Sequence, residues 1–199
     1  MTDLRRAVLI ATKLKGFVQA ADLAGIFALT PSAIEMVLEA LESEGMVVSR
    51  LAGQKLSAAG AGQAAAIWAE DARFIGIRDL FRIAEDVEQL APIFKPILSD
   101  WRMIKTKDGP TRNTHRDIAY DDALIDELFS ACDQLKPILL DLGKVLPRCG
   151  FYKGRLENAL KALEEADTRF VADDDVDSVA VIWFEVVGDV SNLKGAVSG

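Results

Sequence analysis

The chain has 199 residues, half of them hydrophobic, which is enough apolar material for one larger domain or two small ones. Its formal net charge of −8 and its pI of about 4.8 contrast with the basic patches through which most DNA-binding proteins contact phosphates. The sequence has neither a signal-peptide pattern nor an apolar run of about 18 residues, so it predicts a cytoplasmic protein without a membrane span.

Residues that commonly bind metals or act as nucleophiles are scarce. The single histidine, His115, excludes a multi-histidine metal site, and Cys132 and Cys149 lie too far apart for a metal-type spacing. We expect both cysteines to be reduced thiols. The sequence also lacks a nucleophile elbow, a kinase signature and a phosphate-binding loop. It therefore predicts a protein with no metal, no cofactor and no catalytic activity of its own.

The first 73 residues show helical patterns separated by short turns. Apolar residues at helical spacing predict helices over residues 3–14, 20–28, 31–44 and 61–73. Before the last of these helices, β-branched residues predict a short hairpin with strands over residues 46–51 and 55–57 and a turn at 52–54. The predicted order is helix, helix, turn, helix, hairpin, helix.

The third predicted helix carries a complete set of start and stop signals. Thr30 can cap its N-terminus, Pro31 suits its first turn, and Gly45 can adopt the left-handed conformation that ends it. Its apolar face consists of Ile34, Val37, Leu38 and Leu41. Its charged residues are all acidic, namely Glu35, Glu39, Glu42 and Glu44.

This order of elements, followed by Leu56-Ser57-x-x-Gly60 before a helix, resembles winged-helix regulators of the MarR type. In those proteins the return strand of the hairpin often ends in a similar Leu-Thr-x-x-Gly segment. The resemblance covers residues 1 to about 70. It implies a winged helix-turn-helix whose third helix reads DNA, although such domains also mediate protein contacts.

A recognition helix contacts base edges through its exposed N-terminal side chains, and the wing contacts the backbone or the minor groove. The predicted DNA-contacting residues are Ser32, Glu35, Met36, Arg50 and Lys55. The glutamates of the helix oppose this function, because carboxylates repel phosphates. Two alternatives therefore stay open: a sequence-specific DNA-binding protein, or a winged helix that contacts protein and exposes its glutamates to solvent.

Residues 74–199 hold most of the net negative charge and read as helical. The predicted helices cover residues 74–98, with a continuation to 103, and residues 120–146, 155–166 and 176–190. We expect kinks or breaks at Pro92, Pro96 and Pro137. The segments between them predict a polar loop over 105–116, a connection over 147–154, an acidic turn over 172–175 and a frayed end over 191–199.

This second part resembles the helical domain of a poorly characterised bacterial group that is common in actinobacteria and regulator-like. The matching segments are Ser99-Asp100-Trp101-Arg102, Gly109-Pro110, residues 113–121, Leu146-Pro147-Arg148 and residues 181–185. Members often carry a His or Tyr-His pair shortly before the tryptophan, where this chain has residues 177–180 without histidine. Similar modules also accompany phosphoenolpyruvate-synthase-like dikinases, which implies a rival function as an accessory subunit.

Polar and aromatic residues gather around the single histidine. The predicted ligand- or partner-binding residues of this region are Trp101, Asn113, His115, Asp117, Tyr120 and Asp121. A histidine close to a carboxylate can act as a general base, a phosphate carrier or a ligand-sensing group. The alternative is a loop in which Asn and Asp side chains bind backbone groups and Tyr120 starts the next helix.

A second candidate pocket involves Trp183 and Glu185 near the C-terminus. The aromatic residues at helical spacing favour the core, whereas an acid beside two aromatic residues could line a pocket between helices. The aspartates over residues 173–177 lack the glycine and the distal glutamate of an EF-hand loop. We expect them to form a solvated turn that caps the last helix.

Together these patterns predict a mainly α protein with a small β-hairpin, divided into a winged helix-turn-helix domain (residues 1–73) and an α-helical domain (residues 74–199). The leading hypothesis is a MarR-like transcriptional regulator, expected to be a homodimer, whose helical domain pairs the subunits or senses a small-molecule effector. The rival hypothesis is an accessory subunit or regulatory module that does not bind DNA and serves an enzyme such as a phosphoenolpyruvate-synthase-like dikinase.

Overall fold

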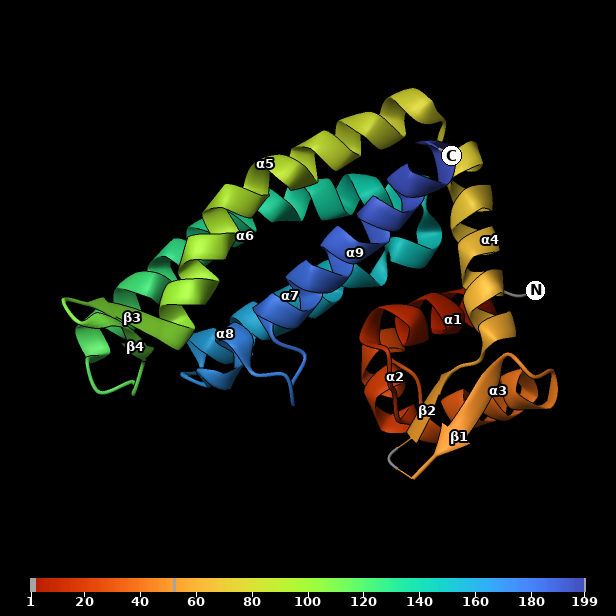
Figure 1. The fold of residues 1–199 in the computed structure, drawn as a ribbon, viewed down its shortest axis with the longest axis horizontal. Helices are drawn as coiled ribbons and strands as arrows, with labels where there is room; N and C mark the ends of the chain where they lie inside the picture. Colours follow the sequence, from red (N-terminus) through yellow and green to blue (C-terminus); the bar gives the residue numbers. More distant parts are fainter. Residues whose placement is uncertain (1–2, 52, 199) are drawn as a thin grey trace.

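The computed structural model describes residues 3–51 and 53–198 (Figure 1). The described chain is mainly helical and carries two small antiparallel hairpins, so the mainly α class is confirmed and one hairpin was not predicted. The first part of the chain consists of α1 (Asp3–Lys15), α2 (Ala20–Phe27), α3 (Pro31–Ser43), β1 (Val47–Arg50), β2 (Gly53–Leu56) and α4 (Ala58–Ile75).

The termini of α3 form as predicted. The Thr30 hydroxyl accepts a hydrogen bond from the Ala33 N–H (3.3 Å), and Gly45 follows the helix with a left-handed φ of 73°. Ile34, Leu38 and Leu41 are buried, while Val37 is half-buried. The amphipathic pattern of α3 therefore gave its buried face correctly.

A third segment joins the hairpin β1–β2. Val47 pairs with Leu56 and Arg50 with Gly53, while Val18, between α1 and α2, exchanges two backbone hydrogen bonds with Gln54 (2.9 and 2.8 Å). The return strand thus begins at Gly53, inside the predicted turn, because the pairing with Val18 extends it. The predicted turn residue Ala52 lies outside the described residues.

The start of α4 packs tightly against the segment that enters the hairpin. The Ser57 hydroxyl donates to the Gly45 carbonyl (2.5 Å) and accepts from the Gly60 N–H (3.0 Å). A Cβ on Gly60 would lie 1.9 Å from the Met46 carbonyl oxygen. The helix begins at Ala58 rather than at residue 61, because Ser57 caps it.

The second part is built on long helices. It comprises α5 (Ile77–Arg102), β3 (Met103–Thr106), β4 (Gly109–Arg112), α6 (Ile118–Val145), a 3-10 turn η1 (Pro147–Cys149), α7 (Phe151–Glu164), α8 (Arg169–Ala172) and α9 (Val179–Ser198). The antiparallel pair α5–α6 extends away from α1–α3 and ends in the hairpin β3–β4 (Figure 1). The last helix, α9, packs against α4, α5 and α7, and joins both parts into one core.

Of the kinks or breaks expected at the prolines, the breaks are wrong. Both α5, which contains Pro92 and Pro96, and α6, which contains Pro137, are continuous helices. A proline removes one helical hydrogen bond, but Leu90, Phe94 and other apolar side chains on both sides of the prolines remain buried on one face of α5. Tertiary packing of this face therefore outweighs the local cost.

Several other boundaries differ from those predicted. The polar loop expected over residues 105–116 contains the hairpin β3–β4, in which Met103 pairs with Arg112. Helix α7 begins at Phe151 rather than at residue 155. Helix α9 extends to Ser198, so the fraying expected after residue 190 is wrong, because Leu193 is fully buried. The predicted C-terminal residue of the frayed end, Gly199, lies outside the described residues.

Across residues 3–51 and 53–198, no single helix has the length and apolar character needed to cross a membrane. By length and composition alone, one helix pair, α2 with α3, would pass as a broken span, and it is bent by 116°.

Candidate functional site

The outer surface of α3 lies at the opposite end of the molecule from β3–β4 (Figure 1). All five residues predicted to contact DNA are exposed there or on the adjacent hairpin, namely Ser32, Glu35, Met36, Arg50 and Lys55. Met36 is 69% exposed although it is apolar. The structure therefore leaves this surface accessible to a large partner.

Two of the four glutamates on α3 are engaged in contacts within the protein. The Glu42 carboxylate accepts hydrogen bonds from the Ser49 N–H (3.1 Å) and from the Ser49 hydroxyl (2.9 Å), and Glu44 pairs with Arg5 of α1. These contacts attach the C-terminal half of α3 to β1 and to α1. All four glutamates are exposed, as the solvated-face alternative expects, although Glu42 and Glu44 also make these contacts within the protein.

What remains on this surface carries a small excess of negative charge. Glu35 and Glu39 have no hydrogen-bond or ion-pair partner among the residues that the structure describes. Arg50 donates to the carbonyl of its neighbour Ser49 (3.0 Å), and Lys55 stands exposed on β2 opposite Val48. Three carboxylates without an ion pair among the described residues, those of Glu35, Glu39 and Glu42, thus face solvent on α3 and its hairpin, together with the two cations.

His115 sits in a rigid arrangement at the base of the hairpin β3–β4. Its backbone is left-handed, with a φ of 55°, and its N–H donates to the Asn113 side-chain oxygen (2.9 Å). The Asn113 amide donates to Asp121 (2.9 Å), and the other oxygen of Asp121 lies 3.0 Å from His115 Nδ1. The Trp101 ring lies against the imidazole, with ring centroids 4.5 Å apart. Four of the predicted residues therefore form one cluster.

The other two predicted residues of this region serve the helix that follows. Asp117 accepts a hydrogen bond from the Tyr120 N–H (3.1 Å) and so caps α6. Tyr120 is half-buried, and burial, followed by the nearby Asp100, raises the pKa of its hydroxyl. The contact between Asp117 and the Tyr120 backbone is the loop structure that was the alternative, and neither residue makes a hydrogen bond to the four clustered residues within the described chain.

Trp183 and Glu185 do not share a pocket. Trp183 is buried and stacks on Phe94 at 4.3 Å, so it is a core residue. Glu185 is buried and accepts a hydrogen bond from Arg155 of α7 (2.7 Å), while Lys15 of α1 pairs with its other oxygen (2.7 Å). Glu185 therefore connects α9 to both α7 and α1.

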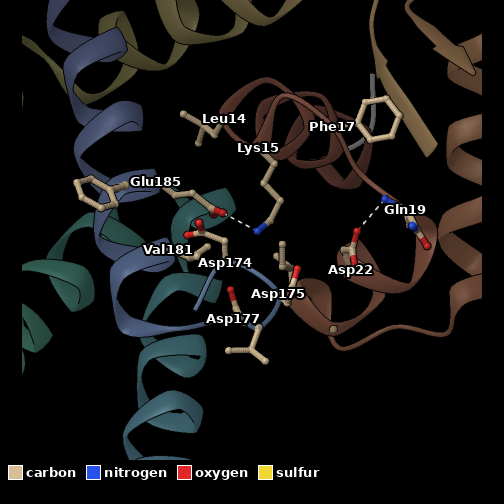
Figure 2. A pocket seen from close by; sticks show the side chains of 14 residues that line it. Leu14, Lys15, Phe17, Gln19, Asp22, Asp174, Asp175, Asp177, Val181 and Glu185 are labelled. Carbon is tan, nitrogen blue, oxygen red and sulfur yellow. Dashed lines mark hydrogen bonds and ion pairs between the residues drawn. The ribbon is translucent and has the colours of Figure 1, made fainter. Parts of the chain in front are cut away.

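A cleft of about 580 Å³ separates α1–α2 from α9 and the segment before it (Figure 2). Its charged lining is largely acidic and consists of Lys15, Asp22, Asp174, Asp175, Asp177 and Glu185. Asp177 pairs with Arg155 (2.5 Å), so it does not cap α9 as predicted. Ser178 caps that helix instead, through a hydrogen bond from the Val181 N–H (3.3 Å).

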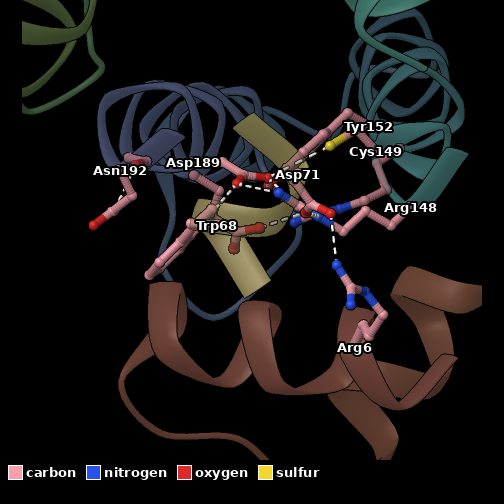
Figure 3. Close-up of polar contacts among 11 residues, drawn as sticks. Arg6, Trp68, Asp71, Arg148, Cys149, Tyr152, Asp189 and Asn192 are labelled. Carbon is pink, nitrogen blue, oxygen red and sulfur yellow. Dashed lines mark hydrogen bonds and ion pairs between the residues drawn. The ribbon is translucent and has the colours of Figure 1, made fainter. Parts of the chain in front are cut away.

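A buried charged network joins the two parts of the chain (Figure 3). Arg148 of η1 donates to Asp71 of α4 (2.5 Å) and twice to Asp189 of α9 (2.8 and 3.0 Å). Arg6 of α1 donates to the other oxygen of Asp71 (2.7 Å). Asp189, which is completely buried, also accepts from the Trp68 indole N–H (2.6 Å).

This network was not predicted, although the sequence contains a signal for it. Asp189 lies between buried valines of a helix pattern, and a carboxylate in such a position needs buried partners. Burial alone would lower the pKa of Arg148, but Asp189 and Asp71 raise it above its usual value. Burial and the nearby Asp189 also raise the pKa of Tyr152, whose hydroxyl donates to Asp189 (3.2 Å).

The environment of the two cysteines predicts slow thiol chemistry. Cys132 and Cys149 are free and fully buried, and burial raises the pKa of Cys132 to about 12 and that of Cys149 well above its usual value. Because the thiolate is the reactive form, we expect neither thiol to react with a disulfide reagent in the native protein at neutral pH. In denaturant both thiols should react. Fast reaction of either thiol in the native protein would contradict this prediction.

Comparison with known proteins adds no identification: no family model, no curated protein and no solved structure matches the chain. Among the described residues, no group of three or more His, Cys, Asp and Glu side chains has the arrangement to hold a metal ion.

Proposed function

We propose that residues 3–75 form a winged helix-turn-helix domain that binds DNA through α3 and the hairpin β1–β2, as part of a MarR-like transcriptional regulator. The observation that carries this proposal is the geometry of α2 and α3. These helices are bent by 116° across the three residues between Phe27 and Pro31. A helix-turn-helix joins two helices at about 90–120° through a turn of three or four residues.

The hairpin supports the same proposal. Its pairing with Val18 places the segment between α1 and α2 beside β2, which gives α3 a rigid base. The ion pair between Glu44 and Arg5 reduces the electrostatic objection, because it compensates one of the four carboxylates. The cations Arg50 and Lys55 lie on the strands of the wing, where winged helices contact the DNA backbone or the minor groove.

A second candidate function is contact with a protein, as expected for an accessory subunit. The observation that favours it is the exposed Met36 between Glu35 and Glu39. Such a surface suits a partner with a basic rim around an apolar pocket. The dikinase partner rests on the sequence resemblance alone.

Fluorescence anisotropy separates these two functions. The purified chain would be titrated onto duplex DNA from the region upstream of its gene and onto unrelated duplex, at low and at near-physiological salt. The regulator predicts saturable binding that favours the upstream DNA and weakens steeply as salt rises. An absence of saturable binding at low salt would overturn the proposal and favour the protein partner.

We expect Arg50→Ala to weaken this binding. The loss of one phosphate contact should reduce the slope of log K against log salt by about one. The matched control is Lys107→Ala, which removes an exposed cation from the turn of the other hairpin and should leave both affinity and slope unchanged. Equal effects of the two substitutions would remove the wing from the proposed interface.

A further inference from the structure

The cluster around His115 borders a cavity that the DNA-binding proposal does not use. This cavity, of about 520 Å³, lies between the base of the hairpin β3–β4 and α8. Its volume falls in the range of small-molecule sites, about 300–1,000 Å³. The lining side chains that matter here are Trp101, Arg102, Arg112, Asn113, His115 and Arg169.

The imidazole is held in place from several sides, yet it stays accessible. Its side chain is 44% exposed, whereas the Asp121 side chain that binds Nδ1 is 12% exposed. Asn113, which is buried, holds both the backbone of His115 and the carboxylate of Asp121. Since Asp121 engages Nδ1, Nε2 is the ring nitrogen left to meet a ligand. A carboxylate that orients a histidine in this way is typical of functional imidazoles.

Three arginines and the carboxylate of Asp173 line the cavity. Two of these arginines lie close to carboxylates outside the lining. Arg169 is paired with Asp167 (2.7 Å), and Arg102 donates to the Ala172 carbonyl (3.0 Å) and lies 3.5 Å from Asp174.

Arg112 differs from the other two arginines. It is exposed on β4 and has no ion pair or side-chain hydrogen bond with any residue in 3–51 or 53–198. A guanidinium that the protein leaves unpaired beside an oriented histidine can bind an oxyanion through two parallel N–H donors.

We propose that this cavity binds a small molecule through an oxyanion, either a phosphate or a carboxylate group, which accepts hydrogen bonds from Arg112 and from the Nε2–H of the imidazolium form of His115. Arg102, anchored to α8 through the Ala172 carbonyl, adds positive charge at the wall of the cavity. The site lies at the opposite end of the molecule from α3 (Figure 1). The proposal of anion binding can therefore be tested separately from the proposal of DNA binding.

The single histidine makes the test direct, because its imidazole signals in an NMR spectrum belong to one residue. Protein labelled with ¹³C,¹⁵N-histidine would be titrated with inorganic phosphate, with acetate and with chloride, at one pH and constant ionic strength. We expect a saturable shift of the His115 signals with phosphate, with acetate or with both. The titration in which the shift saturates identifies the oxyanion that the site prefers. Shifts that stay linear, or that chloride reproduces, would overturn the proposal.

Two arginine variants test the geometry. Arg112→Ala should weaken the binding of the saturating anion at least tenfold, while Arg78→Ala should leave it unchanged. Arg78 is a suitable control because its side chain is 95% exposed at the start of α5, remote from β3–β4. Since Arg112 is exposed, its removal should leave the free-state His115 signals and the circular dichroism spectrum in place. Unchanged affinity in Arg112→Ala would rule out the proposed contact.

Discussion

Asp189→Asn is expected to lower the free energy of unfolding by about 3–5 kcal/mol. The substitution keeps the shape of the side chain but removes the charge that compensates Arg148 at a completely buried position. Among the residues that the structure describes, Asp71 would then be the only carboxylate in contact with Arg148, and Arg6 already shares it. Urea denaturation followed by circular dichroism measures the loss.

The matched control is Asp133→Asn. Asp133 pairs with Lys136 on the surface of α6, with 70% of its side chain exposed, so its removal should cost less than about 0.5 kcal/mol. A double-mutant cycle with Arg148→Met should show strong coupling, because the second substitution removes the buried cation that the first leaves uncompensated. Additive effects, or equal losses in Asp189→Asn and Asp133→Asn, would mean that the network does not hold the two parts together.

Gly60→Ala is the second substitution with a large expected effect. Its Cβ would lie 1.9 Å from the Met46 carbonyl oxygen and 2.9 Å from the Met46 carbonyl carbon, both of which are backbone atoms. Either α4 or the segment entering β1 must therefore move. We expect a loss of about 1–3 kcal/mol or more in the free energy of unfolding.

Gly62→Ala provides the control within the same helix. Gly62 is exposed, and a Cβ there meets no atom within 4 Å. Alanine favours a helix interior over glycine by about 0.5–1 kcal/mol, so this variant should be as stable as the wild type or more stable. If both glycine substitutions change the stability alike, the close approach of α4 to Met46 is not what the fold depends on.

The segment around Gly60 illustrates which structural features can be predicted from the sequence. The Leu56-Ser57-x-x-Gly60 segment was identified only through a resemblance, yet each of its polar contacts has a local cause. Ser57 caps α4 and also donates to Gly45, while Gly60 permits the close approach to Met46. Such short-range features of turns and caps can be read from a sequence, as the predicted termini of α3 also illustrate.

The predictions that proved wrong concern features that do not depend on short-range signals. The continuous helix through Pro92 and Pro96, and the buried end of α9 at Leu193, depend on packing between distant segments. The hairpin β3–β4 was not predicted because Gly109 and Pro110 favour a loop. In the structure Gly109, with a φ of 112°, forms part of the turn, and Pro110 lies on the strand opposite Lys105.

The candidate sites divide in the same way. Asn113, His115 and Asp121 are neighbours in sequence, so their grouping could be predicted. The arginine of α8 at their cavity, Arg169, lies 48 to 56 residues further along the chain. The apolar residues around Asp189 indicate that its buried carboxylate requires a partner. Only the fold shows that this partner is Arg148, which also binds Asp71.

The most direct test of the proposed function is a selection of DNA sequences from a random duplex pool with the full chain. The account predicts enrichment of a defined motif, because the exposed face of α3 would read base edges. If Glu35 accepts a hydrogen bond from cytosine, Glu35→Ala should select the same motif with that one preference removed. If the selected sequences show no more enrichment than those from a control selection with bare resin, sequence-specific DNA binding by α3 is contradicted.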